Sequence, residues 1–202
     1  LALASPCQLA GFVHIEAGFD NQKPWREIAW LEHHCTLPFR AVAGIDLLLS
    51  SNDFQQHLNK LSQYQSVVGV RDILDENAVE YLSNIQVQQN LAELAQQQLV
   101  FECQMLLTDT QATKQLTSVV TALPTLSVVI NHAGFPPEKT ESALWQEWLN
   151  NMLVLSRFEN ISIKCSGFEM INRQYCASWQ QLIIKQCLDT FGINRTMLAS
   201  NF

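Results

Sequence analysis

Residues 126–136, with the sequence LSVVINHAGFP, decide how the rest of the chain is interpreted. The apolar, β-branched run Leu126–Ile130 is typical of a buried strand. His132 follows this run and stands directly before a Gly/Pro break. The carboxyl ends of strands are where α/β barrels place their chemistry. The stretch therefore predicts a buried strand, Leu126–His132, with a functional imidazole at its end.

The same alternation of strand-like and helix-like segments extends outward along the chain. The strand-like runs are Gly11–Ala17, Arg40–Asp46, Val67–Ile73, Val100–Met105, Leu126–His132, Ile161–Ser166 and Met197–Asn201. The helix-like runs are Trp25–Cys35, Asp53–Tyr64, Val87–Gln98, Thr108–Leu123, Thr140–Phe158 and Ser178–Phe191. Repeated strand–helix units predict a parallel sheet with crossover helices. Because no change of composition marks a linker, we expect a single domain over residues 1–202.

The distribution of polar residues within each strand separates the two folds that such a series allows. In the segment 161–167, Ser162, Lys164 and Ser166 share one face, and the apolar side chains share the other. Most other strands also have one apolar face and one face with polar groups near its end. A doubly wound sheet carries helices on both faces and is apolar on both. The pattern therefore favours an α/β TIM (β/α)8 barrel, and no GxGxxG dinucleotide motif follows any strand.

The inner face of this barrel is predicted to carry the polar side chains of the strands. These are His14, Glu16, Asp46, Arg71, Glu102, Gln104, His132, Lys164 and Asn201. Singly buried charges cost several kcal/mol, so these groups either pair in a structural network or hold a ligand. The natural role of Arg71 and Lys164 is to bind an anionic substrate group. Metal ligation or proton transfer suits His132.

Composition limits the partners that this chain can have. The net charge is −7, and the absence of any Lys/Arg cluster disfavours a nucleic-acid partner. No stretch approaches the ~20 apolar residues of a membrane span. The six cysteines form no CxxC pair, which indicates reduced thiols in a cytoplasmic protein. A small-molecule substrate remains, and the oligomeric state is not predicted.

Four segments together resemble the amidohydrolase-related family of TIM-barrel, often metal-dependent hydrolases. They are Asn131–Pro136 (NHAGFP), Ile163–Gly167 (IKCSG), Val68–Leu74 (VGVRDIL) and Phe191–Phe202 (FGINRTMLASNF). The resemblance runs from about Gly11 onward, and the most similar branch contains sugar lactonases and pyrone-dicarboxylate lactonase. It implies hydrolysis of a lactone or related cyclic ester of an acidic or sugar-derived small molecule, by water attack at the barrel mouth.

The resemblance also implies roles for individual residues. His132 matches the family's histidine on the sixth strand, a catalytic group and metal ligand. The substrate-binding positions that it implies are His14 and Glu16 on the second strand and the basic residues Arg71 and Lys164. Gln104, which shares their face, is expected to bind substrate with them.

Two departures from the family pattern concern the metal and the ends of the chain. The family's eighth strand usually ends in Ser-Asp, whose Asp activates the attacking water, and here the pair is Ser200-Asn201. An amide cannot act as a general base and is a poorer metal ligand than a carboxylate. The His-x-His pair that opens the family's first strand is also missing. We therefore expect at most one divalent metal, such as zinc, on His132.

These departures lead to further expectations. The chain is expected to hold barrel strands two to eight, without the first strand and the last helix, as a fragment that need not be active by itself. Asn201 is the second expected catalytic position. The alternatives are a metal-dependent decarboxylase of an unsaturated or aromatic acid, and a barrel that binds a small acid without turnover.

Overall fold

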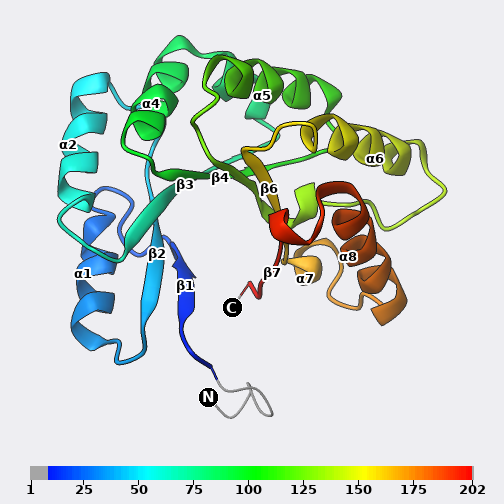
Figure 1. Ribbon diagram of the computed structural model, residues 1–202, viewed down its shortest axis with the longest axis horizontal. Helices are drawn as coiled ribbons and strands as arrows, with labels where there is room; N and C mark the ends of the chain where they lie inside the picture. The colour runs from blue at the N-terminus through cyan, green and yellow to red at the C-terminus, as the bar shows by residue number, and fades with distance from the viewer. Residues whose placement is uncertain (1–8, 202) are drawn as a thin grey trace.

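The computed structural model of the protein describes residues 9–201, and its centre is one parallel β-sheet (Figure 1). The sheet has seven strands in the order β1-β2-β3-β4-β5-β6-β7, each paired with the next in the chain. The strands are β1 (Phe12–Ile15), β2 (Phe39–Gly44), β3 (Val67–Asp75), β4 (Val100–Met105), β5 (Val128–Ile130), β6 (Ile161–Cys165) and β7 (Thr196–Leu198). Cys7, one of the predicted reduced cysteines, lies outside the described residues.

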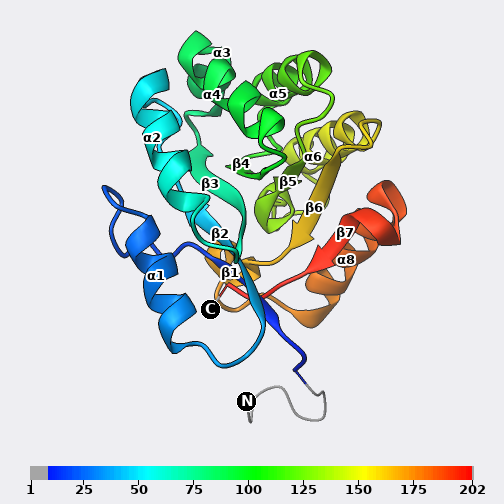
Figure 2. The same cartoon turned by 60° about the vertical axis from the view of Figure 1, so that its left-hand side comes forward.

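The helices lie on the outer side of the curled sheet (Figure 2). They are α1 (Trp25–His34), α2 (Ser51–Leu61), α3 (Ala78–Ser83), α4 (Ile85–Gln96), α5 (Thr110–Ala122), α6 (Ala143–Leu155), α7 (Phe168–Ile171) and α8 (Ala177–Phe191), with short 3₁₀ turns η2 (Asn131–Gly134) and η3 (Ile193–Arg195). A curled parallel sheet inside a layer of helices is the architecture of an incomplete TIM barrel. This confirms the predicted fold class; the missing first strand and last helix stay a prediction.

The starts of several helices are set by side-chain caps. Ser50 accepts a hydrogen bond from the Asp53 amide, and Asp109 accepts from the amides of Gln111 and Ala112. Helix α6 begins at Ala143, later than the predicted Thr140, because Ser142 is its cap and accepts from the Trp145 amide. A capped amide has its hydrogen bond outside the helical ladder, so the cap fixes where the helix begins.

The structure differs from the sequence prediction in several other elements, among them β7, which ends at Leu198 and not at the predicted Asn201. The short helices α3 and α7 were not predicted, because neither is long enough to show a helical period. Strand β5 ends at Ile130, so His132 lies in the turn η2 and not in the strand. The predicted strand Leu126–His132 was therefore too long at its functional end.

The core lies between the sheet and the helices. Val70, Phe101, Cys103, Ile130 and Ile163 are fully buried there, one apolar face of each strand pointing outward to the helices. This confirms the predicted alternation in β3, β4 and β6 and leaves the opposite face of the sheet for polar groups.

The rims of the sheet are partly open to solvent. Val13 of β1 is 59% exposed and Leu198 of β7 is 72% exposed. Neither strand pairs with another strand on its outer edge within residues 9–201. Over the same residues, no helix has the length and apolar character needed to cross a membrane.

Candidate active site

Polar side chains gather in two places at the carboxyl ends of the strands. The first is an open cleft of about 650 Å³ over β1, β2 and β3. Its walls are the β1–α1 loop, with Glu16, Asn21 and Gln22, and the ends of β2 and β3, with Asp46, Arg71 and Asp72. The second, here called the buried polar cluster, lies on β4, on β6 and in the turns after β5 and β6. It comprises Glu102, Gln104, Asn131, His132, Lys164 and Ser166, all at most 8% exposed.

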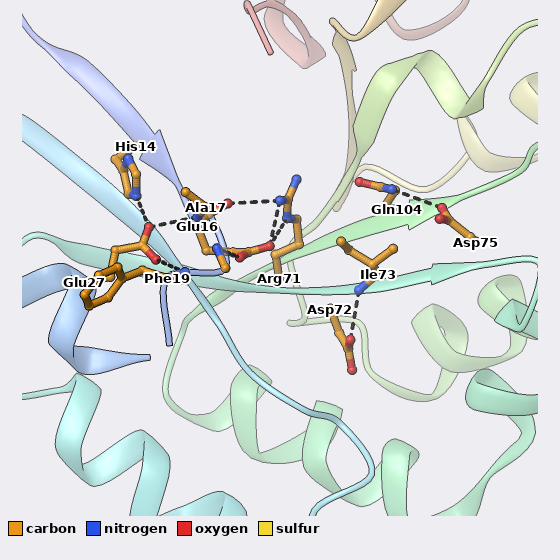
Figure 3. Close-up of polar contacts among 11 residues, drawn as sticks. His14, Glu16, Ala17, Phe19, Glu27, Arg71, Asp72, Ile73, Asp75 and Gln104 are labelled. Carbon is orange, nitrogen blue, oxygen red and sulfur yellow. Dashed lines mark hydrogen bonds and ion pairs between the residues drawn. The ribbon is translucent and has the colours of Figure 1, made fainter. Parts of the chain in front are cut away.

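The centre of the open cleft is an ion pair between Arg71 and Glu16 (Figure 3). The guanidinium donates from Nε (2.9 Å) and Nη2 (2.6 Å) to Oε1 of Glu16, and from Nη2 to its main-chain oxygen (3.1 Å). Gly44 lies level with Arg71 in the sheet, and a Cβ there would stand 3.5 Å from Cγ of Glu16. Gly44 thus lies directly beneath the ion pair, where a Cβ would make an ordinary contact with Glu16.

Asp72 points away from Arg71 (Figure 3). Its carboxylate accepts from the Leu47 amide (2.9 Å) and from the Ile73 amide (2.9 Å), and so holds the loop after β2. Burial raises the pKa of Asp72 to about 6, and the negative charges of Asp46 and Glu16 add to the shift. A carboxyl with such a pKa is partly protonated in mildly acidic solution.

The placement of His14 corrects the prediction that it lines the pocket. Its register partner is Ala41, which packs in the core beneath α1, so His14 faces the helix. Its Nε2 lies 2.5 Å from Oε1 of Glu27, a residue of the first turn of α1. Glu16 still reaches the inside, because β1 ends at Ile15 and the strand alternation does not continue beyond it.

The buried polar cluster contains a second ion pair. Nζ of Lys164 lies 2.5 Å from Oε1 of Glu102, and the two side chains are 10% and 5% exposed. The other carboxylate oxygen of Glu102 is buried without a hydrogen-bond partner among residues 9–201, as is Oδ1 of Asn131. Gln104 donates to Oδ1 of Asp75 (3.1 Å). The cluster therefore has more acceptors than the described residues satisfy.

His132 sits in a left-handed turn. His132, Ala133, Gly134 and Phe135 all have positive φ, at 53°, 51°, 67° and 55°. Three hydrogen bonds hold the turn. The Phe135 amide donates to the His132 carbonyl (2.9 Å), and the Leu107 amide donates to the Gly134 carbonyl (2.9 Å). The indole of Trp148 donates to the Ala133 carbonyl (2.8 Å). Such a conformation costs roughly 1–2 kcal/mol for each residue other than Gly, and it typically persists at functional sites.

The imidazole of His132 is fixed from β6. Its Nδ1 lies 3.0 Å from Oγ of Ser166, and a Cβ on Gly167 would stand only 2.3 Å from that nitrogen. Burial lowers the pKa of His132 to about 4, and the charges of Arg71 and Lys164 lower it further while Glu169 opposes them. At neutral pH the ring is uncharged, and its Nε2 has no protein partner among the described residues.

Asn201 is the predicted catalytic residue that the structure does not bring to the others. It is exposed and lies three residues beyond the end of β7. Residues 9–201 also contain no group of three His, Cys, Asp or Glu side chains placed to hold a metal ion. Arg71 and Lys164, whose positive charges act on His132, disfavour a cation beside it. These residues by themselves do not fit a divalent metal.

Three residues of the site were not among the predicted ones. Ser166 was placed on the correct face by the strand alternation, but nothing in the sequence paired it with His132. Asn131 was taken for part of the strand. Trp148 of α6 is fully buried, and its indole N–H donates to the Ala133 carbonyl in the turn of His132.

Comparison with known proteins identifies the family. The amidohydrolase family model matches residues 63–202, more than half of the chain. A relative from Sinorhizobium fredii, named uncharacterized protein y4mH, is 25% identical over 214 residues, which cover 100% of this chain and 70% of that protein.

Solved structures show the same fold. An amidohydrolase from Burkholderia multivorans with bound HEPES superposes with a TM-score of 0.79 at 16% identity, over 96% of this chain and 69% of that one. Another crystal form of that protein holds zinc, with a TM-score of 0.78. A candidate 2-pyrone-4,6-dicarboxylic acid hydrolase from Pseudomonas putida gives 0.70 at 20% identity, over 96% and 67% of the two chains. With the family match to residues 63–202, these likenesses lead to one conclusion: the chain belongs to the amidohydrolase family of hydrolases.

Proposed function

We propose that the protein hydrolyses a lactone or a related cyclic ester of a small molecule at the mouth of the barrel. The observation that carries the proposal is His132, a buried imidazole that is uncharged at neutral pH and fixed in a left-handed turn beside Arg71 and Lys164. The name of the Pseudomonas putida neighbour, a candidate hydrolase of a cyclic ester, supports the same reaction class.

The proposed role of His132 is to polarise the ester carbonyl. If the Ser166 hydroxyl donates to Nδ1, the remaining ring proton is on Nε2, which then donates to the carbonyl oxygen. Because the ring is already neutral at neutral pH, it is present as the donor without first losing a proton. Water attack on the carbonyl carbon places negative charge on this oxygen, and a fixed donor there lowers the barrier. The proton that the attacking water loses passes to the solvent of the open cleft, and the ring oxygen takes up a proton as its bond to the carbonyl carbon breaks.

Asn201 has no step in this reaction, because it is exposed beyond the end of β7, apart from the other predicted site residues. Zinc belongs to the structure of the Burkholderia multivorans protein; for this chain a metal on His132 stays a prediction, which metal analysis of the purified protein would test. No step of the proposed reaction depends on it.

A screen of cyclic esters against the purified protein tests the proposal. We expect ring opening by the wild type, a loss of at least about 100-fold in His132→Gln, and a smaller loss in Ser166→Ala. His33→Gln is the control, because His33 is exposed on α1. Full activity of His132→Gln would contradict the proposal. Release of carbon dioxide without ring opening would point to a decarboxylase, and binding without turnover, converted to activity by Asn201→Asp, to a non-catalytic barrel.

A further inference from the structure

The basic residues of the mouth are both already paired. Arg71 shares its Nε and Nη2 donors with Glu16, and Lys164 lies against Glu102. Each pair is shielded from water, with side-chain exposures of 13% and 13% for the first and 10% and 5% for the second. Shielded charges attract each other more strongly than exposed ones, so a ligand anion must compete with a built-in carboxylate at each cation.

The other ionisable side chains that line the open cleft are acids. Asp46 and Asp72 also line the open cleft, so this cleft holds three carboxyl groups and one guanidinium. In the buried polar cluster, Oε2 of Glu102 and Oδ1 of Asn131 have no hydrogen-bond partner among residues 9–201. A buried acceptor without a hydrogen-bond donor destabilises the protein by about 1–3 kcal/mol. These atoms therefore favour a ligand that donates hydrogen bonds.

The ion pairs disfavour an anionic ligand, and the unpaired acceptors favour a ligand that donates hydrogen bonds. We propose that Glu16 and Glu102 determine the charge of the ligand: the mouth accepts an uncharged ring that carries hydroxyl groups and discriminates against the same ring with a carboxylate. This runs against the anionic substrate expected from Arg71 and Lys164 in the sequence. That the ring is an ester rests on the proposed function, whereas the charge preference rests on the ion pairs.

Two matched probes test the charge preference separately from the hydrolysis of the ester. Glucono-1,4-lactone and glucaro-1,4-lactone share the same five-membered ring and differ in the replacement of one hydroxymethyl group by a carboxylate. Calorimetry at neutral pH measures the binding of both, and ring opening is followed separately. We expect gluconolactone to bind to the wild type at least about tenfold more tightly than glucarolactone. One repulsive contact between the ligand carboxylate and a partly buried glutamate is worth about that factor.

Substitution of the two acids tests their role directly. Glu16→Gln and Glu102→Gln should each shift the ratio of the two dissociation constants about tenfold toward glucarolactone. Glu147→Gln is the matched control, since it changes the net charge equally from an exposed position on α6. Thermal unfolding verifies that each variant is folded, and Glu16, the more exposed of the two acids, provides the test if Glu102→Gln does not fold.

The outcomes distinguish the two proposals. Tighter binding of glucarolactone by the wild type, binding of neither ring, or an unchanged ratio in the folded variants would overturn the charge inference. The expected ratios without any ring opening would leave this inference standing and overturn the proposed hydrolysis. Ring opening with the opposite charge preference would do the reverse.

Discussion

The open cleft over β1–β3 and the buried polar cluster place the same kind of ion pair in two settings, one at the wall of a cleft and the other inside the protein. Each contains a cation paired with a glutamate, Arg71 with Glu16 and Lys164 with Glu102. The first pair borders a cleft of about 650 Å³, and the second is buried with an unsatisfied carboxylate oxygen. The difference suits a division of labour in the proposed reaction, in which the cleft would admit the ligand and the buried polar cluster would hold the imidazole of His132 in a fixed place.

The largest effect is expected from breaking the two ion pairs separately. Lys164→Met leaves Glu102 buried without a counter-charge and should lower the free energy of unfolding by about 3–5 kcal/mol. Arg71→Met leaves Glu16 beside the cleft, where water can reach it, and should cost only about 1–2 kcal/mol. Urea unfolding measures both. Equal losses would show that the two environments are alike and would remove the comparison.

A second effect concerns the fixed position of His132. Gly167→Ala introduces a methyl group 2.3 Å from the imidazole at a φ of +64°, and should destabilise the fold by about 2–3 kcal/mol. Gly192→Ala is the matched control, because its φ is +76° and nothing lies within 4 Å, so only the backbone strain of about 1 kcal/mol is expected. Similar losses in both would show that His132 can move aside.

Acid should weaken the buried polar cluster through His132. Its pKa is about 4 in the folded protein and near 6.5 in the unfolded chain, so between these values the unfolded chain binds more protons. The histidine contribution to stability is therefore complete above about pH 6.5 and falls by about 3 kcal/mol as the pH drops to 4. Asp72, whose pKa is raised, acts in the opposite direction. His132→Gln should remove the histidine contribution in unfolding experiments across this range, whereas His33→Gln should retain it.

The smallest effect is expected at the rim of the cleft. Glu27 accepts from His14 and from the amides of Ala17 (2.8 Å) and Phe19 (3.3 Å), and so holds the loop that carries Glu16 (Figure 3). Glu27→Gln should cost about 0.5–1 kcal/mol and speed hydrogen exchange of these two amides. Glu32→Gln, near the other end of α1, should instead affect the Ser66 amide. Unchanged exchange at Ala17 would mean that the loop is held otherwise.

Strand alternation predicted the fold and part of the site, because it depends only on local geometry. It placed Arg71, Glu102 and Lys164 on the inner face, where the two ion pairs form. The pairing itself was left open, since Glu16 and Arg71 are 55 residues apart in sequence and alternation carries no information on which charges meet.

The failures of the sequence prediction lie at the ends of strands. His14 was assigned to the same face as Glu16, but β1 stops between them and Glu27 binds the imidazole on the helix side. His132 was expected in the strand, yet the chain leaves β5 after Ile130 for a left-handed turn. Two hydrogen bonds from distant residues, Leu107 and Trp148, hold that turn, and a local pattern cannot reveal them.

The order of the sheet also has a consequence for how the protein is made. Because each strand pairs with the next one along the chain, no pairing in the described sheet has to wait for a segment synthesised much later. Each new strand–helix unit can dock on the preceding one as it leaves the ribosome, which limits the time that its apolar face is exposed to other nascent chains. The buried polar cluster is then completed only when β6 arrives, so we expect the ligand-binding half of the mouth to form before the half that holds the imidazole.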